Sequence, residues 1–322
     1  MFRTQFPVTP CPSTMDHSSK VYLIGSCFSE HISQKLTNNK FSILSNPFGI
    51  IFNPISLANS IRRQMKGFWV NPMEIFENGS VFRSFDFHSN CGHPDKEEAI
   101  RRMNDALRSG KIFLDKCSHL IITFGTSLVY TEKNTGKVVA NNHKMPASLF
   151  EKRQLSPEEI VADWTDLIRE LKIKYPSLQI IFTLSPVRHL KDGAVENALS
   201  KAVLLQSIHQ LKHNFSDIYY FPSYEIMLDD LRDYRFYTKD MLHPNEVAVD
   251  YIWEIFKKVC INETCYSIIG QLEQIHTAML HKPFFPELKE HEEFKLKMLD
   301  KIEKLQKKYS GVDLSVERSF FS

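Results

Sequence analysis

The chain has 322 residues, of which 43% are hydrophobic, and carries 40 basic and 38 acidic side chains. This composition excludes a disordered protein, and a formal net charge of +2 gives no electrostatic case for nucleic acid or an anionic membrane as partner. No apolar run approaches the roughly 20 residues that span a bilayer, and no apolar signal region opens the chain. We therefore expect a soluble, cytoplasmic protein.

The first predicted strand, residues 21–24, leads into a turn suited to presenting a nucleophile. Gly25 ends the apolar run, Ser26 and Cys27 follow, and a helix is predicted over residues 30–36. Glycine permits the sharp turn, and the N-terminus of the helix directs backbone N–H groups towards an anion. An ordinary strand–turn–helix connection uses the same residues, so this stretch alone does not decide between the two readings.

The following segment is predicted to contain a second strand and two helices. The strand covers residues 41–45, and Asn46-Pro47-Phe48-Gly49 then forces a loop. Helices are expected over residues 54–65 and 95–107. Between them, residues 82–88 alternate aromatic and polar side chains, which is typical of an edge strand or a hairpin arm.

The middle of the chain alternates buried strands with amphipathic helices. Ser156 and Glu159 flank Pro157 as a capping box that starts one of these helices. Strands are predicted at residues 119–124, 178–184 and 218–221, with a further strand and loop at 138–144, and helices at 157–175, 196–211 and 244–259. This alternation predicts an α/β protein with a mainly parallel sheet and helices on both faces. Ligands bind such sheets at the carboxyl ends of the strands.

The last part of the chain has a different character. Two helices are predicted over residues 268–280 and 288–309, separated by prolines. We expect residues 1–260 to form the catalytic domain and residues 261–322 a C-terminal helical hairpin. The hairpin packs either on the main domain or on a partner copy, so a homo-oligomer formed through these helices stays open.

A second chemistry-bearing segment lies late in the core. Asp240 and His243 are three residues apart, directly before Pro244, where the last core helix is predicted to begin. The carboxylate can orient the imidazole, which can then take a proton from a serine hydroxyl. The alternative is a capping aspartate beside a surface histidine.

Several blocks of the chain, in order, resemble the GSCFA family, which is related to the SGNH hydrolase (GDSL-like) superfamily. The resemblance covers about residues 1 to 260, and Ser29 stands where the family signature ends in alanine. The blocks are Gly25-Ser26-Cys27-Phe28, Asn46-Pro47-Phe48-Gly49, Phe124-Gly125-Thr126, Ser185-Pro186-Val187-Arg188-His189 and Asp240-Met241-Leu242-His243-Pro244.

The resemblance implies a three-layer αβα sandwich and a Ser–His–Asp site. Carried over to this chain, Ser26 is the nucleophile, His243 the general base and Asp240 the residue that orients it. The backbone N–H groups of Ser26 and Gly49 are the implied oxyanion donors.

One block departs from the superfamily pattern. SGNH enzymes have Gly-x-Asn-Asp in the third block, whereas this chain has Gly125-Thr126-Ser127, with Ser127 in place of the oxyanion-binding Asn. Loss of one such donor costs about 10²–10³ in rate. Ser127 itself is one candidate for the missing donor. Asn141, Asn142 and His143 in a later loop are the next candidates, and an ordinary polar turn explains these three equally well.

Other side chains have weaker claims to function. Arg188 can bind a substrate carboxylate or phosphate with its planar fork, or form a structural ion pair. His88 is a candidate pocket residue. His88, Cys91 and His93 have a spacing that a metal can use but lack a fourth ligand, so we expect neither metal nor cofactor. The chain has 6 cysteines and no C-x-x-C pair, which favours free thiols, and Cys27 is the rival nucleophile to Ser26.

The sequence thus predicts a serine-dependent acyl-ester hydrolase of esterase or deacetylase type, acting on a small-molecule or carbohydrate acyl ester. Two alternatives remain. An acyltransferase would use the same site with a different acceptor, and a non-catalytic binding module on a degenerate hydrolase fold would explain the missing Asn.

Overall fold

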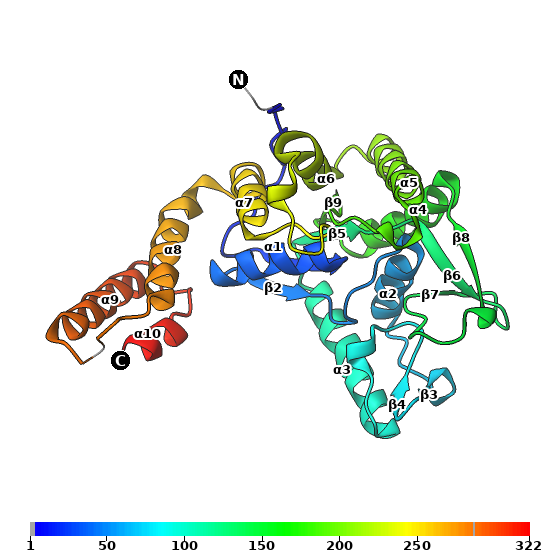
Figure 1. Ribbon diagram of the computed structural model, residues 1–322, viewed down its shortest axis with the longest axis horizontal. Helices are drawn as coiled ribbons and strands as arrows, with labels where there is room; N and C mark the ends of the chain where they lie inside the picture. The colour runs from blue at the N-terminus through cyan, green and yellow to red at the C-terminus, as the bar shows by residue number, and fades with distance from the viewer. Residues whose placement is uncertain (1–3, 286) are drawn as a thin grey trace.

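The computed structural model describes residues 4–285 and 287–322, and a five-stranded parallel sheet lies at its centre (Figure 1). The strand order is β10-β9-β5-β1-β2, and every neighbouring pair is parallel. The strands are β1 (Lys20–Gly25), β2 (Ser42–Ser45), β5 (His119–Phe124), β9 (Gln179–Leu184) and β10 (Tyr219–Phe221). The predicted α/β class with a mainly parallel sheet is confirmed.

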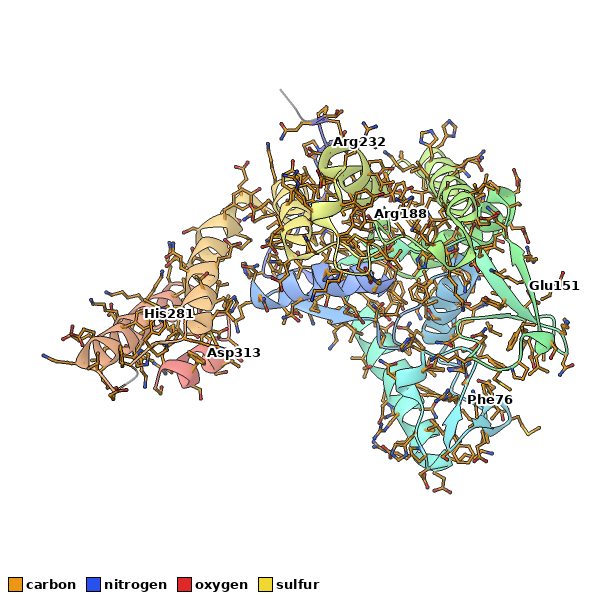
Figure 2. All side chains as sticks on the ribbon, viewed as in Figure 1. Phe76, Glu151, Arg188, Arg232, His281 and Asp313 are labelled. Carbon is orange, nitrogen blue, oxygen red and sulfur yellow. The ribbon has the colours of Figure 1, made fainter. Side chains whose placement is uncertain are left out.

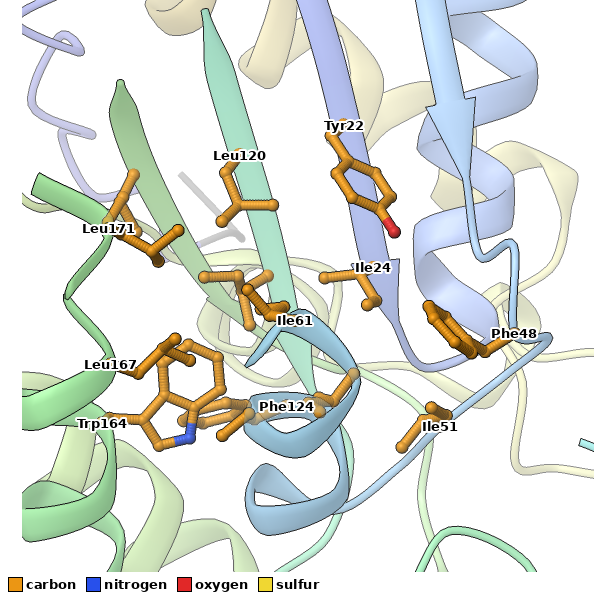
Figure 3. Close-up of a cluster of buried hydrophobic side chains, with 14 of the residues drawn as sticks. Tyr22, Ile24, Phe48, Ile51, Ile61, Leu120, Phe124, Trp164, Leu167 and Leu171 are labelled. Atoms are coloured by element: carbon orange, nitrogen blue, oxygen red, sulfur yellow. The ribbon is translucent and has the colours of Figure 1, made fainter. Parts of the chain in front are cut away.

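One face of the sheet is covered by four helices. These are α2 (Pro54–Lys66), α3 (Lys96–Leu114), α4 (Pro157–Lys174) and α5 (Ala194–Asn214). Alternate strand residues such as Tyr22 and Leu120 point to this face, as the period of two requires. Figure 3 shows Trp164 of α4 beside Phe124 of β5, and their ring centroids are 5.1 Å apart. The core on this side is continuous from β1 to α4.

The opposite face carries α1 (Cys27–Asn38) and α7 (Glu246–Cys260), giving the three layers of an αβα sandwich. The intervening strand residues, such as Val21 and Ile181, pack here. The N-terminal arm crosses this layer, because the Met15 N–H donates to the Cys260 carbonyl at 2.8 Å. Both faces of the sheet are therefore buried, which explains why its strands read as continuous apolar runs.

Two helices begin elsewhere than predicted. α1 starts at Cys27 rather than near residue 30, because Ser26 is its N-cap. α7 starts at Glu246 rather than at Pro244, because the Asn245 side chain caps it by accepting the Ala248 N–H at 3.1 Å. The capping box of α4, formed by Ser156 and Glu159, is present as predicted.

Small elements decorate the edge of the core. β3 (Phe76–Asn78) and β4 (Val81–Arg83) form a hairpin, so the predicted strand over 82–88 is wrong beyond residue 83. A second sheet consists of β6 (Leu128–Glu132), β7 (Val138–Val139) and β8 (Phe150–Gln154), in the order β7-β6-β8. Of these three strands, the sequence predicted only β7.

Short helical turns connect these elements. A one-turn helix α6 (Ser223–Glu225) continues into a π-helix, η5 (Ile226–Leu231). The 3₁₀ turns are η1 (Pro72–Glu74), η2 (Ser89–Cys91), η3 (Ala147–Leu149), η4 (Leu190–Asp192), η6 (Tyr234–Phe236) and η7 (Glu263–Cys265).

The C-terminal helices form a small cluster of their own, away from the sheet (Figure 1). They are α8 (Tyr266–Leu280), α9 (Lys289–Lys308) and a third helix, α10 (Ser315–Phe321), which the sequence analysis did not predict. Leu272, Ile302 and Phe321 are buried among them. In the described part of the chain, no helix combines the length and apolarity needed to cross a membrane.

Candidate active site

The turn after β1 buries Ser26 at the carboxyl edge of the sheet. Gly25 has φ +142°, and a Cβ there would lie 2.2 Å from the Thr123 carbonyl oxygen, so only glycine fits. The Ser26 N–H donates to that same oxygen at 3.2 Å, which ties the turn to β5. Ser26 has no exposed surface. The chain thus fixes this serine by backbone contacts at the edge where ligands bind in such sheets.

Ser26 also caps α1, so its hydroxyl lies at the positive end of a helix dipole. Its Oγ accepts the Phe28 N–H at 3.4 Å. The neighbouring Cys27 is the first residue of the helix, and burial raises the pKa of its thiol. Since the thiolate is the nucleophilic form, this environment favours Ser26 over Cys27 as the nucleophile.

The loop before α7 joins Asp240 to His243. His243 Nδ1 lies 2.6 Å from Asp240 Oδ2. The other carboxylate oxygen accepts the Thr238 hydroxyl at 2.6 Å and the N–H groups of Leu242 and His243 at 2.8 and 3.1 Å. These bonds, that from Thr238 first, hold the pKa of Asp240 well below its usual range. The carboxylate is therefore ionised at neutral pH and can fix the tautomer and the orientation of the imidazole.

The structure does not close the triad. Among the described residues, no hydrogen bond joins the Ser26 hydroxyl to His243, whose side chain is 40% exposed. Burial and then the charge of His243 lower the pKa of His31, which lies one turn beyond Cys27, so the His243 side chain acts electrostatically on α1. The contact between nucleophile and base stays a prediction, and it needs a movement of the exposed loop or of a side chain.

The implied oxyanion donors already have acceptors. The Gly49 N–H donates to the Asn46 carbonyl at 2.7 Å, in a turn where Gly49 has φ +74°. The Ser26 N–H is held by Thr123, as described above. The Ser127 hydroxyl donates to Ser200 Oγ on α5 at 3.2 Å. Any oxyanion role for these groups would therefore compete with an existing bond.

The later loop candidates are engaged elsewhere. His143 Nε2 lies 2.8 Å from the Ser84 carbonyl oxygen and its Nδ1 3.0 Å from Ser89 Oγ. The Asn142 side chain accepts the Lys144 N–H at 3.2 Å. No hydrogen bond within the described ranges connects Asn142 or His143 to Ser26. The contacts that the structure shows for these two residues shape their own loop.

His88 packs against the loop that follows β2, where its N–H donates to the Phe48 carbonyl at 2.9 Å. Its Cβ would be 2.3 Å from a Cβ built on Gly49, so glycine is required for His88 to pack there. His88 Nδ1 lies 3.0 Å from Asn90 Oδ1. The structure thus places His88 against the loop that follows β2, and its predicted role in a pocket stays a prediction.

A buried lysine that the sequence analysis missed connects two strand ends. Lys201 of α5 is 2% exposed, and its Nζ donates to the carbonyls of Gly125 and Ser185 at 2.7 and 2.8 Å. Burial lowers the pKa of Lys201 to about 7. These two bonds use both N–H groups of a neutral amine, whereas an ammonium has three N–H groups and would need a third acceptor. Its spacing from Asn197 and Leu204 puts it on the buried stripe of the helix, but a helical lysine normally points to solvent, so this spacing alone does not single it out.

The loop after β9 brings a cation beside the His243 loop. The Arg188 N–H donates to the Leu242 carbonyl at 3.2 Å. Burial raises the pKa of the Tyr224 and Tyr237 phenols, and the nearby Arg188 guanidinium opposes this rise. Figure 2 labels Arg188 near the middle of the molecule. No described carboxylate forms an ion pair with Arg188. The structural ion pair considered for Arg188 is therefore absent from this part of the chain.

The adjacent histidine is neutral. Burial, the charge of Lys201 and the charge of His243 lower the pKa of His189 to about 4. Its backbone N–H donates to Asn197 Oδ1 at 2.8 Å, while its Nε2 is buried without a hydrogen-bond partner among the described residues. All six cysteines are free, as predicted, and no group of three metal-ligating side chains gathers within the described ranges.

Comparison with known proteins identifies the family. The model of the GSCFA family matches residues 20–256, and that of the GSCFA C-terminal domain matches residues 272–322. No curated protein matches the sequence.

Three solved structures of carbohydrate esterases resemble the chain at low identity. An acetyl xylan esterase from the rumen bacterium Butyrivibrio proteoclasticus shares 12% identity over 79% of this chain and 65% of its own, with a TM-score of 0.37. A family 2 carbohydrate esterase with a carbohydrate-binding domain from Corynascus thermopiles (Myceliophthora fergusii) shares 10% identity over 82% of this chain and 69% of its own, with a TM-score of 0.39. A family 3 carbohydrate esterase from Talaromyces cellulolyticus shares 10% identity over 80% of this chain and 99% of its own, with a TM-score of 0.31.

Proposed function

The chain belongs to the GSCFA family, and from this membership together with the site geometry we propose that it is a serine-dependent acyl-ester hydrolase. The observation that carries the proposal is the Asp240–His243 pair, with its 2.6 Å contact between the carboxylate and the imidazole. The bonds from Thr238, Leu242 and His243 N–H to Oδ1 are those of a capping aspartate, whereas the contact of Oδ2 with the His243 ring goes beyond them.

The proposed reaction proceeds by acyl transfer through Ser26. His243 takes the proton of the Ser26 hydroxyl as Oγ attacks the ester carbonyl carbon. The tetrahedral intermediate then collapses, the C–O bond to the alcohol breaks, and His243 returns the proton to the leaving oxygen. Water repeats the sequence on the acyl-serine and releases the acid. Asp240 stabilises the imidazolium in both halves of the reaction.

For the substrate, we propose an ester of a carbohydrate or another small alcohol. Arg188 lies next to the His243 loop, with its guanidinium near the phenols of Tyr224 and Tyr237 and no carboxylate partner in the described structure, so it can bind a polar or anionic group on that substrate. An acyltransferase would share every one of these groups and differ only in the acceptor that reaches the acyl-serine. Because the buried Ser26 hydroxyl and the exposed His243 ring are not joined by a hydrogen bond, the non-catalytic binding module stays a second candidate.

Labelling with a fluorophosphonate probe tests the proposal. We expect the wild-type chain to be labelled and Ser26→Ala to lose the label, because the probe forms its bond with the serine oxygen. Cys27→Ser is the matched neighbour control and should keep the label. A wild-type chain that stays unlabelled, or a Ser26→Ala variant labelled as fast as wild type, would exclude Ser26 as an active nucleophile. Hydrolysis of 4-nitrophenyl acetate, with and without a sugar acceptor, then separates hydrolase from transferase.

A further inference from the structure

The candidate active site lacks a free donor at the groups that the family resemblance implies. Each of these groups already donates a hydrogen bond to an acceptor within the protein: the N–H groups of Ser26 and Gly49 and the hydroxyl of Ser127. A tetrahedral intermediate nevertheless needs preorganised donors where its negative charge develops. The question is which polar hydrogen near Ser26 is buried and unused.

Asn46, directly after β2, provides such a hydrogen. Its backbone N–H donates to the Leu23 carbonyl at 3.0 Å, and its own carbonyl accepts the Gly49 N–H. Its side-chain Oδ1 accepts the Gly25 N–H at 2.9 Å. Its Nδ2 is buried and has no hydrogen-bond partner in the described structure. Every polar group of Asn46 except this amide nitrogen is therefore satisfied.

The position of the amide is fixed by the strand end that presents the nucleophile. Oδ1 and Nδ2 share one carbon atom, so the bond from Gly25 holds the whole carboxamide beside the residue that precedes Ser26. Asn46 itself has φ +41°, a left-handed conformation that asparagine adopts more readily than most residues. The residue is only 9% exposed, so water does not freely replace the missing acceptor.

A buried donor without an acceptor is costly, and native structures rarely keep one without a reason. In an active site the natural acceptor is one that exists only during the reaction. The amide N–H is then preorganised in the empty enzyme and forms its bond as the carbonyl oxygen becomes an alkoxide.

We propose that Asn46 Nδ2 donates to the oxyanion and takes the place of the Asn that is missing from the third block. This assignment rests on the proposed function, and it makes Asn46 a catalytic residue that contacts the reacting oxygen. The donor comes from the loop after β2 rather than from the loop after β5.

Asn46→Asp is the sharpest test, because it keeps an oxygen to accept the Gly25 N–H and removes both amide hydrogens. We expect kcat for 4-nitrophenyl acetate, and the rate of fluorophosphonate labelling, to fall 10²–10³-fold. KM should change less than threefold, because the donor acts on charge that is absent from the bound ester. The matched control is Asn53→Asp, another buried asparagine, whose Nδ2 donates to the Val139 carbonyl. It should keep kcat within threefold.

The outcomes separate this inference from the proposed function. If wild type is labelled and Asn46→Asp reacts within threefold of it, the donor is another group and the inference fails, while the hydrolase proposal stands. If wild type is never labelled, the hydrolase proposal fails and the oxyanion role falls with it.

A second measurement covers an Asn46→Asp variant that does not fold. In wild type labelled with ¹⁵N-asparagine, one side-chain NH₂ pair should shift on phosphonylation of Ser26. The absence of any shifted pair would overturn the assignment.

Discussion

Ser26 and His243 are held in different ways, although the proposed reaction needs them together. Ser26 is fully buried, and its position follows from backbone contacts between neighbouring strands of the central sheet. His243 is 40% exposed, and its position follows mainly from hydrogen bonds within the loop of residues 238–243, to which the Arg188 N–H adds one bond at the Leu242 carbonyl. The nucleophile side is thus preorganised by the whole fold, whereas the base side is organised locally.

This difference indicates where the site can move. Loops with few buried contacts belong to the least stable parts of a structure, while central strands open only on global unfolding. The step that closes the triad is therefore expected on the His243 side. Loop closures of this kind also exclude water and complete a catalytic arrangement. Variants of the loop should accordingly change the rate with little change in stability, whereas variants that disturb the packing at the sheet should also change stability.

Asp240→Asn should give the largest effect on the loop side. The amide removes the charge that stabilises the imidazolium and no longer selects the tautomer of His243. We expect kcat to fall about 10⁴-fold, as in the serine-protease template. The melting temperature should stay within a few degrees, because the Asp240 side chain is 46% exposed. Ester hydrolysis and thermal unfolding measure the two quantities. Activity within tenfold of wild type would mean that another group orients the base.

Lys201→Met should act on stability and reveal itself through pH. Burial lowers the pKa of Lys201 in the folded chain to about 7, from 10.5. Between pH 7 and pH 10.5 the unfolded wild-type chain binds more protons than the folded chain. The free energy of unfolding of wild type therefore rises with pH relative to that of the variant, by at most about 1.4 kcal/mol per pH unit. Below pH 7 the difference should level off. Urea unfolding at pH 6, 7, 8 and 9 gives the four free energies.

The matched control for this comparison is Lys212→Met, an exposed position near the end of the same helix. It should show no pH-dependent difference from wild type over this range. A Lys201→Met difference that is equally flat between pH 7 and 9 would mean that Lys201 is protonated in the folded chain.

The sequence was a reliable guide where one local rule dominates. The central strands are apolar runs bounded by glycine, proline or polar turns, and their parallel arrangement follows from the helices between them. It failed where a local signal had a competitor. Pro244 predicted a helix start, but Asn245 is the N-cap of α7 and the helix begins at Glu246. β6 and β8 carry too many polar residues to stand out as strands.

The residues of the candidate site also divide into those that a local sequence rule identifies and those that it does not. Asp240 and His243 could be paired from their spacing, because both lie on one loop. Lys201 could not be identified, because a helical lysine normally points to solvent and only packing shows that this one is buried. Nor could Asn46, whose relevance lies in a bond that its side chain does not make. Such absences depend on three-dimensional contacts and leave no pattern in the chain.

Thr238→Val should give the smallest effect and tests how local the base side is. The Thr238 hydroxyl donates to Asp240 Oδ1 at 2.6 Å and is the largest contributor to the low pKa of Asp240. Valine keeps the shape and removes that donor, while the N–H groups of Leu242 and His243 still hold the carboxylate. The pKa of Asp240 should rise towards its ordinary value, yet the carboxylate stays ionised at pH 7. A net hydrogen bond contributes about 0.5–1.5 kcal/mol, so we expect kcat/KM to fall roughly two- to tenfold at pH 7. A loss as large as that of Asp240→Asn would show that Thr238 holds the whole loop in place, and the base side would then be less redundant than its hydrogen bonds indicate.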